Sequence, residues 1–351
     1  MSQTMNKKRV VVVCPGRGTY NKEELGYLRR YHADKTEIVD LIDEYRAGKQ
    51  QLPIAQLDQM DKYAMRTHTA GENASALIYA CALSDYFSID KDEYEIAAVT
   101  GNSMGWYIAL AVAGALTQPN AIEVINTMGS MMENGIIGGQ MIYPIVDENW
   151  HVNHQQKEQV LAHLEAVNQL TDCKVYVSIE LGGYLVFGGN NEGLKALGER
   201  LPMIEDRYPM NLFNHAAFHT PLMANVSMNA LEQLPPSLFQ QPKIPLVDGR
   251  GQIWQPYSCD LNALHDYTLN TQVVEPYQFS KAIEVAIKEF APDKLIVLGP
   301  GATLGGAIAQ CLISHQWLGM TSKTDFINKQ KTSPFVLAMG IETQRQQAVT
   351  S

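Results

Sequence analysis

The stretch GNSMGWY, Gly101–Tyr107, decides how this 351-residue chain is built, because it places a serine between two glycines at the spacing G-x-S-x-G. The preceding residues YEIAAVT form a short apolar run that predicts a buried strand, and the following residues YIALAVAGAL predict a helix. A serine at such a strand-to-helix turn holds its hydroxyl at the edge of the sheet. The next backbone N–H, that of Met104, lies at the start of the helix and can donate to an oxyanion. The pattern predicts that Ser103 is a nucleophile, and a tight turn without chemistry is the alternative.

The same order of strand, glycine turn and helix recurs towards both ends of the chain. Val10–Val13 is a continuous apolar strand that leads into PGRGTY, and KLIVLGPG leads into the helical pattern ATLGGAIAQCLISH. Apolar strands that are each followed by a helix are typical of a parallel sheet covered on both faces. The chain is therefore expected to have an α/β core.

The middle of the chain follows a different order. Strand, helix, strand, strand, helix and strand are expected in turn from QMIYPIV, QKEQVLAHLEAVNQL, KVYVSIEL, YLVFGG, EGLKALGERL and DRYPMNL. This βαββαβ order is that of the ferredoxin-like unit. We therefore expect a small α+β subdomain at 138–210, inserted into a core made of residues 1–137 and 211–351. A cleft between two such bodies is a common place for a ligand.

Composition and charge limit the classes of protein to which this chain can belong. Hydrophobic residues make up 46% of the chain and charged residues 18%, which is a globular composition. The net charge of −10 argues against nucleic acid as a partner. The five cysteines are odd in number and form no C-x-x-C pair, so we expect reduced thiols and a cytoplasmic location. No apolar stretch is long enough to span a membrane, and the first apolar run is too short for a secretory signal.

A nucleophilic serine needs a base, and the chain has nine histidines. His215 and His219 both lie in FNHAAFHTPLM, where the chain leaves the insert and returns to the core, so either could face the cleft. Their spacing does not choose between them. His151 and His154 lie close together in HVNH, but no carboxylate or cysteine completes a ligand set, so no metal site is expected.

Five segments, in order along nearly the whole chain, resemble motifs of the malonyl-CoA:acyl carrier protein transacylase family, which includes the acyltransferase domains of fatty acid and polyketide synthases. They are PGRGTY, GNSMGW, FHTPLM, QVVEPY and GPGATL. The resemblance implies an α/β-hydrolase-like core with a ferredoxin-like insert, a division that the pattern of elements already indicates. It also implies transfer of an acyl group from acyl-CoA, as substrate, to the phosphopantetheine thiol of an acyl carrier protein, with no bound cofactor.

The resemblance further implies a role for each matching residue. Ser103 would be acylated, and His219 would act as base and later as acid. The main-chain carbonyl of Gln272 would orient His219, so that no aspartate is required. The backbone N–H groups of Arg17 and Met104 would form the oxyanion hole.

The chain departs from the family's pattern where the acyl group would lie. Malonyl-using members hold the free carboxylate with an arginine on a helix after the strand-to-helix turn of the serine, here called the elbow (101–105). That position is Met128 in this chain. A buried carboxylate without a cation costs several kcal/mol. We therefore expect a neutral acyl group in place of malonyl, in a pocket that includes Met128, Phe218 and Asn102. Arg17, which replaces the family's glutamine, is the one route by which malonyl could still be held.

Other changes surround the elbow. Asn102 replaces the family's histidine before the nucleophile, and Trp106 replaces its glutamate after it. The methionines at 128, 131 and 132 either line an apolar pocket or pack as ordinary helix core.

Three other functions fit parts of the sequence. The same acyl-serine could be released by water, which would make the chain a thioester hydrolase that clears carrier proteins. The order Ser103, Asp293, His315 suits an ordinary α/β-hydrolase, but it leaves FHTPLM, QVVEPY and PGRG unexplained. The altered residues around the elbow would also suit a catalytically weak subunit that only binds a carrier protein.

Overall fold

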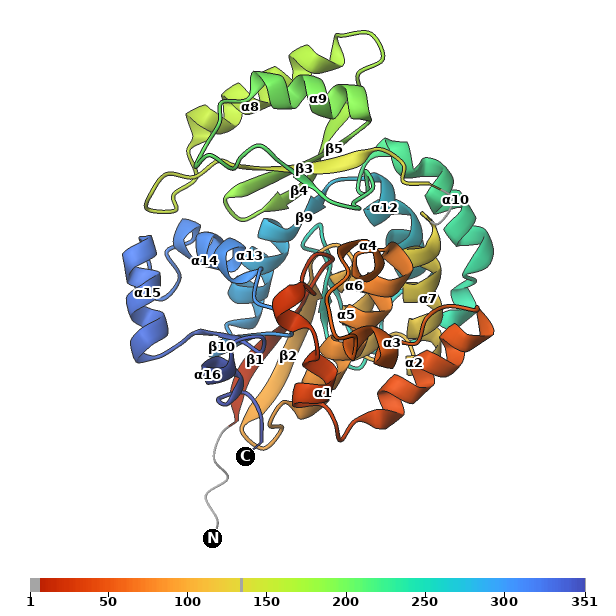
Figure 1. The fold of residues 1–351 in the computed structure, drawn as a ribbon. Coiled ribbons are helices and arrows are strands. Elements are labelled where there is room, and N and C mark those ends of the chain that lie inside the picture. Colours follow the sequence, from red (N-terminus) through yellow and green to blue (C-terminus); the bar gives the residue numbers. More distant parts are fainter. Residues whose placement is uncertain (1–6, 133–134, 351) are drawn as a thin grey trace.

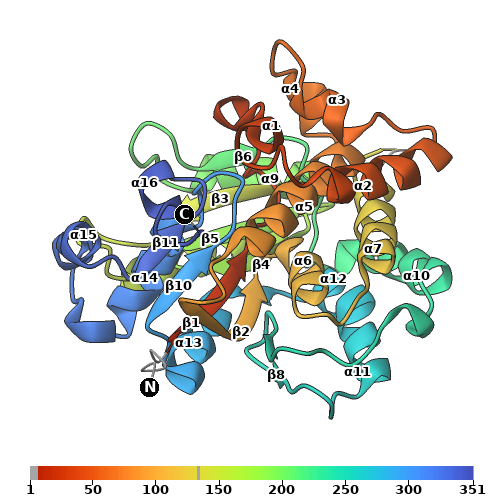
Figure 2. The same cartoon turned by 90° about the horizontal axis from the view of Figure 1, so that it is seen from below.

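A computed structural model describes residues 7–132 and 135–350. They form two sheets with helices packed around them (Figures 1 and 2). The larger sheet has the strand order β11-β10-β1-β2-β7-β8. Its strands are β1 (Lys8–Cys14), β2 (Tyr94–Gly101), β7 (Leu246–Val247), β8 (Ile253–Trp254), β10 (Lys294–Val297) and β11 (Val336–Ala338). All neighbouring strands in it are parallel except for the edge pair β7–β8.

Helices bury this sheet from both sides. Val10–Val13 of β1 are completely buried, as an apolar strand covered on both faces should be. The helices α6 (Gly105–Val112) and α13 (Phe279–Phe290) both pack against β1 and β2, and Figure 2 shows them on opposite sides of the sheet. The predicted α/β core with parallel strands is confirmed.

Further helices surround this core. On the α6 side, α5 (Gly71–Ser88) packs against both α6 and α7 (Gln118–Ser130). The others are α1 (Tyr27–Tyr31), α2 (Thr36–Gly48), α3 (Ile54–Asp58), α4 (Met65–His68), α10 (Ala224–Gln233), α11 (Leu261–Asp266), α12 (Gln272–Val274), α14 (Gly305–Ser314), α15 (Lys323–Thr332) and α16 (Glu342–Arg345). A π-helical turn at Tyr267–Thr271 joins α11 to α12.

The smaller sheet lies above the core in Figure 1 and has the order β6-β3-β5-β4-β9. Its first four strands in the chain are β3 (Gly139–Pro144), β4 (Val175–Leu181), β5 (Tyr184–Gly189) and β6 (Met210–Leu212), and they pair antiparallel. Two helices, α8 (His154–Asn168) and α9 (Asn191–Arg200), cover its outer face over a separate hydrophobic cluster. The elements follow the strand and helix order expected from the sequence.

The fifth strand of the smaller sheet was not predicted, and it comes from the core. β9 (Tyr277–Gln278) pairs in parallel with β4, Tyr277 opposite Ile179. It follows α12 directly and precedes α13. The smaller sheet is therefore hydrogen-bonded to the same segment that carries the QVVEPY motif.

A buried charge cluster ties α5 to the last helix. The carboxylate of Asp85 accepts hydrogen bonds from Arg345 Nη1 at 2.6 Å and from His32 Nε2 at 2.8 Å. Its other oxygen accepts from the Gly299 N–H at 2.7 Å and from the Tyr27 hydroxyl at 2.9 Å. Burial by itself raises the pKa of Asp85, but the bond from His32 and the charge of Arg345 outweigh it and hold the pKa below its usual value.

We expect Asp85→Asn to lower the free energy of unfolding by about 3–5 kcal/mol at neutral pH, because Arg345 keeps its buried charge without a counter-charge. The measurement is urea denaturation. Because the pKa of Asp85 is lowered on folding, this contribution is present above the unfolded-state pKa and is lost as the pH falls.

Glu284→Gln is the matched control for this prediction. Glu284 pairs with Lys281 and Lys288 at the surface, where such pairs are worth less than about 1 kcal/mol. A loss for Asp85→Asn no larger than that of the control would contradict the structural role of the cluster.

Candidate active site

Ser103 lies at a strained turn between β2 and α6. Its φ of 54° is in the left-handed region that residues other than glycine seldom occupy. The glycines on either side are required sterically, because a Cβ on Gly101 would overlap the carbonyl of Gly105, and a Cβ on Gly105 would overlap that of Cys14. The turn holds the serine hydroxyl above the carboxyl end of the sheet.

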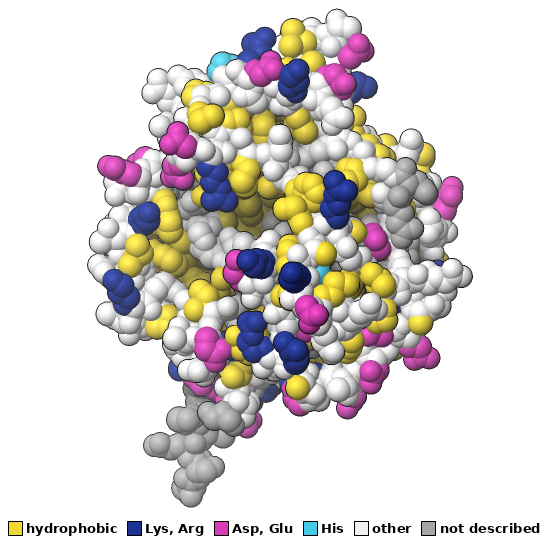
Figure 3. Space-filling view, in the orientation of Figure 1, with side chains coloured by type: hydrophobic (Ala, Val, Ile, Leu, Met, Phe, Trp, Pro, Cys, Tyr) yellow, Lys and Arg dark blue, Asp and Glu magenta, His cyan; other side chains and the backbone are white. Residues whose placement is uncertain are grey.

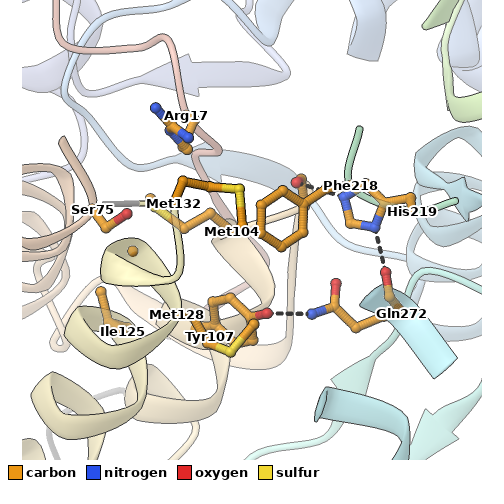
Figure 4. Close-up of a pocket in the computed structure, with 12 residues that line it drawn as sticks. Arg17, Ser75, Met104, Tyr107, Ile125, Met128, Met132, Phe218, His219 and Gln272 are labelled. Atoms are coloured by element: carbon orange, nitrogen blue, oxygen red, sulfur yellow. Dashed lines mark hydrogen bonds between the residues drawn. The ribbon is translucent and has the colours of Figure 1, made fainter. Parts of the chain in front are cut away.

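His219 is the histidine that the fold brings to Ser103. Ser103 Oγ lies 2.7 Å from His219 Nε2, and the other ring nitrogen, Nδ1, is hydrogen-bonded to the main-chain carbonyl of Gln272 (Figure 4). A carbonyl can only accept, so the proton is on Nδ1 and Nε2 is left as an acceptor for the serine. The backbone N–H of His219 also donates to Val273 O at 2.8 Å.

The Gln272 carbonyl is available because its helix ends abruptly. In a continuing helix it would accept from the residue four places on, but that residue is Pro276, which has no N–H. The ring of His219 takes the place of the missing donor.

Two residues that follow the elbow hold this helix end. Gln272 Nε2 donates to the Tyr107 hydroxyl at 2.6 Å and to Thr268 O at 2.9 Å. The fully buried Trp106 donates from Nε1 to Thr268 Oγ1 at 3.0 Å. Trp106 therefore ties the elbow helix to the segment that orients His219.

Ser103 lies between two hollows. On one side is a cavity of about 40 Å³, here called the small cavity, which lies between α5, α6 and α7 and which Met128 and Met132 line (Figure 4). On the other side is a cleft of about 490 Å³ between the smaller sheet and the core. The space-filling view shows the surface hollowed here, with hydrophobic side chains along it (Figure 3). Arg17, Ser103 and Phe218 line both hollows.

The two residues expected to form an oxyanion hole lie beside the serine. Met104 and Arg17 both line the small cavity with Ser103. Met104 directly precedes the first residue of α6, so its N–H has no acceptor within the helix.

The Arg17 side chain is fixed across the cavity wall. Its Nη2 donates to Thr69 O at 2.7 Å and to Asn214 O at 2.9 Å. Burial lowers the pKa of Arg17 to about 10, and the charge of Glu72 opposes this shift.

The remaining predicted residues divide between the two hollows. Met128, which is 4% exposed, faces the small cavity, whereas Asn102 faces the cleft. His215 also lines the cleft, but its Nδ1 is bonded to Gln140 Oε1 at 2.9 Å and it has no hydrogen bond to Ser103 among the described residues. Geometry thus separates the two histidines that spacing could not.

Burial keeps both histidines neutral. It lowers the pKa of His219 to about 4, partly opposed by the hydrogen bond to Gln272. It lowers the pKa of His215 to about 3, and the nearby positive charge of Arg17 adds to the effect.

The alternative pair of Asp293 and His315 is not assembled. Asp293 accepts from the Arg9 N–H at 2.8 Å, and no hydrogen bond links Asp293, His315 and Ser103 within residues 7–132 and 135–350. His151 binds Thr321 O at 2.6 Å. In the part of the chain that the structure describes, no three His, Cys, Asp or Glu side chains gather as a metal site would require.

Sequence reasoning assigned no role to Tyr107, which binds Gln272, and it missed two further residues of the site. Tyr277 donates its hydroxyl to Gly101 O at 2.7 Å and packs 5.3 Å from the His219 ring. Thr268 links Trp106 to Gln272. Tyr277 ends the QVVEPY motif, which was a usable signal, whereas Thr268 lies outside every motif.

No helix in the described ranges combines the length and the apolar character that a membrane crossing needs.

Comparisons with known proteins point to one fold. No family model matches the chain. The malonyl CoA-acyl carrier protein transacylase of Bacillus subtilis is 21% identical over 208 residues, 59% of this chain and 62% of that protein. A non-reducing polyketide synthase of Penicillium aethiopicum is 26% identical over 155 residues, 44% of this chain. The chain thus spans about three fifths of the first relative, at 62%, and 8% of the second.

The likeness of this chain to solved structures covers more of its length. The crystal structure of malonyl-CoA:acyl carrier protein transacylase from Xanthomonas oryzae pv. oryzae superposes with a TM-score of 0.74 over 98% of both chains, at 17% identity. The chain therefore has the fold of these transacylases, and the resemblance that the five motifs indicate is confirmed.

The low pKa of His219 predicts the pH dependence of Ser103 reactivity. A fluorophosphonate probe should label Ser103 at a constant rate above about pH 5, and the rate should fall to half near pH 4, as His219 is protonated. The measurement is intact-protein mass spectrometry after timed labelling, with circular dichroism to verify that the fold persists. His163→Gln, on α8, should leave the profile unchanged. A midpoint near the ordinary value of 6.5 would be incompatible with this buried geometry.

Proposed function

We propose that this chain is an acyl carrier protein S-acyltransferase that works through an acyl-Ser103 intermediate. The observation that carries the proposal is the Ser103–His219–Gln272 chain of hydrogen bonds at the junction of a small cavity and a large cleft. The small cavity suits an acyl group, and the cleft suits the long arm of a thioester. The relatives, whose names describe malonyl transfer to acyl carrier protein, support the same reaction class.

In the first half-reaction, Ser103 Oγ attacks the thioester carbon of acyl-CoA while His219 Nε2 takes the hydroxyl proton. The negative charge that develops on the carbonyl oxygen is stabilised by the backbone N–H groups of Arg17 and Met104. The C–S bond then breaks, and the proton on Nε2 passes to the CoA sulfur.

In the second half-reaction, the phosphopantetheine thiol of the carrier protein gives its proton to His219 Nε2 and attacks the acyl-serine. The ester C–O bond breaks and the proton returns to Ser103. The two thiols occupy the cleft in turn, so the kinetics are ping-pong. Acyl-CoA is a substrate, and no bound cofactor takes part.

The acyl group is neutral in this proposal. Met128 occupies the position where malonyl-using members carry arginine, and it is buried in the wall of the small cavity. Among the described residues that line this cavity, Arg17 is the one permanent cation. Its Nη2 donates to two carbonyls, and its buried Nε has no hydrogen-bond partner within the described part of the chain, so Arg17 stays the one route by which a carboxylate could be held. A carboxylate would find no free partner at Met128 and would lose its hydration.

Two alternatives use the same site. A hydrolase would release the acyl-serine to water, and a carrier-protein binding subunit would not be acylated at all. The hydrogen-bonded serine and histidine favour an enzyme over the binding subunit.

The proposed function includes a division of the chain into a core and a smaller subdomain. We infer an α/β-hydrolase-like core at 1–137 and 211–351 and a ferredoxin-like subdomain at 138–210, of which residues 1–6, 133–134 and 351 lie outside the described residues. The five unpaired thiols support the cytoplasm as the compartment.

Brief incubation with acetyl-, butyryl- and malonyl-CoA should give a Ser103 adduct with the neutral groups and little with malonyl. The measurement is intact-protein mass spectrometry, with Ser103→Ala as the control. Addition of a phosphopantetheinylated carrier protein should move the acyl group onto it. Release of free acid in place of transfer would indicate a hydrolase, and neither adduct nor release would indicate a binding subunit.

Met128→Arg should raise acylation by malonyl-CoA relative to acetyl-CoA by about tenfold, equivalent to about 1.4 kcal/mol, because it supplies the missing cation. Met128→Gln is the matched control, since it is polar and of similar length but neutral. Equal malonyl-to-acetyl ratios in the two variants, with both folded by circular dichroism, would refute the role given to Met128.

A further inference from the structure

A second cavity adjoins the small one. Its volume is about 230 Å³, and its lining includes Ala70, Gly71 and Glu72 at the start of α5. It shares Met132 and Arg17 with the small cavity. These two side chains therefore form the side-chain part of the common wall between the two cavities.

Backbone also separates the two cavities, because Gly129 lines the small cavity and Gly71 lines the second one. α5 and α7 cross where Gly71 faces Gly129, and a Cβ on Gly129 would lie 2.7 Å from Gly71 O and 2.9 Å from Ser75 Oγ. In Figure 4, Ser75 and Ile125 lie at the side of the pocket away from His219. A chain attached to Ser103 cannot extend through this crossing, so further length has to pass between Arg17 and Met132.

The two side chains of the common wall differ in mobility. The Arg17 guanidinium is held by the carbonyls of Thr69 and Asn214. Met132 has an unbranched, uncharged side chain with several rotatable bonds, in the turn that follows α7. It comes four residues after Met128, the spacing that places side chains on one face of a helix, and both face the small cavity. Met132 is thus the replaceable part of the wall.

We propose that Met132 sets the acyl-chain length that this site accepts, and that the substrate class is short, unbranched, neutral acyl thioesters. This inference rests on the proposed acyl transfer. The small cavity, at about 40 Å³, has room for roughly three water-sized groups, which suits acetyl to butyryl chains. A longer acyl chain would have to extend into the second cavity, and Met132 separates that cavity from the small one.

The test compares the rates at which acetyl-, butyryl-, hexanoyl- and octanoyl-CoA acylate Ser103, measured by intact-protein mass spectrometry. In the unmodified protein the rate should fall steeply after butyryl. Met132→Ala joins the two cavities and should raise the hexanoyl-to-acetyl rate ratio at least tenfold. Met132→Phe should act in the opposite direction and lower the butyryl-to-acetyl ratio, so it carries the test if Met132→Ala does not fold.

Met131→Ala is the matched control. Met131 packs against the core but lines neither cavity, so its removal should leave the chain-length profile unchanged. An octanoyl rate equal to the acetyl rate in the unmodified protein would overturn the role of Met132, as would Met132 variants whose profiles match that of Met131→Ala. Either result would leave acyl transfer intact. Absence of any Ser103 adduct with every thioester would instead overturn the proposed function, and this inference with it.

Discussion

The close backbone packing around Ser103 is the constraint on which the rest of the site depends. A left-handed serine is tolerated between β2 and α6 only because neighbouring residues lack side chains. The same demand reaches the first loop, where a Cβ on Gly16 would lie 2.6 Å from the Asn102 carbonyl. The PGRGTY loop can therefore approach the elbow closely enough to bring the Arg17 backbone beside the serine. Looser packing at this one place would move the Arg17 backbone N–H, which we propose as an oxyanion donor, away from Ser103.

The second half of the site depends on a helix end. Pro276 stops α12, frees the Gln272 carbonyl for His219 and directs the chain into β9, which joins the smaller sheet. One short segment thus orients the histidine and also fixes the body that forms the far wall of the cleft. The position of the smaller sheet and the direction of the His219 ring are mechanically linked through it.

Much of this architecture could be predicted from the sequence, and the failures have physical causes. Long apolar strands and the βαββαβ order were visible because burial on one or both faces imposes a repeating pattern. Strands of two or three residues, such as β7, β8, β9 and β11, are too short to carry such a pattern.

The site could be predicted less completely than the fold. His215 and His219 could not be separated because they lie four residues apart in one loop, and only tertiary contacts decide which faces Ser103. The role of Gln272 came from family resemblance, although a proline four residues later was a local signal. The sequence left open whether Met128, Met131 and Met132 line a pocket or pack as core. In the structure Met128 and Met132 line the small cavity, and Met131 is partly buried against the core.

The reliance on main-chain groups has a consequence for how such a protein diversifies. The proposed oxyanion donors are backbone N–H groups, and the partner of His219 Nδ1 is a backbone carbonyl. Substitution by any residue other than proline leaves these groups in the chain and can only displace them. Side chains at positions 17, 102 and 128 can therefore change without removal of the hydrogen bonds that join Ser103, His219 and Gln272. Divergence in sequence at such a site is a poor measure of divergence in chemistry, and substrate range can change while the reaction is preserved.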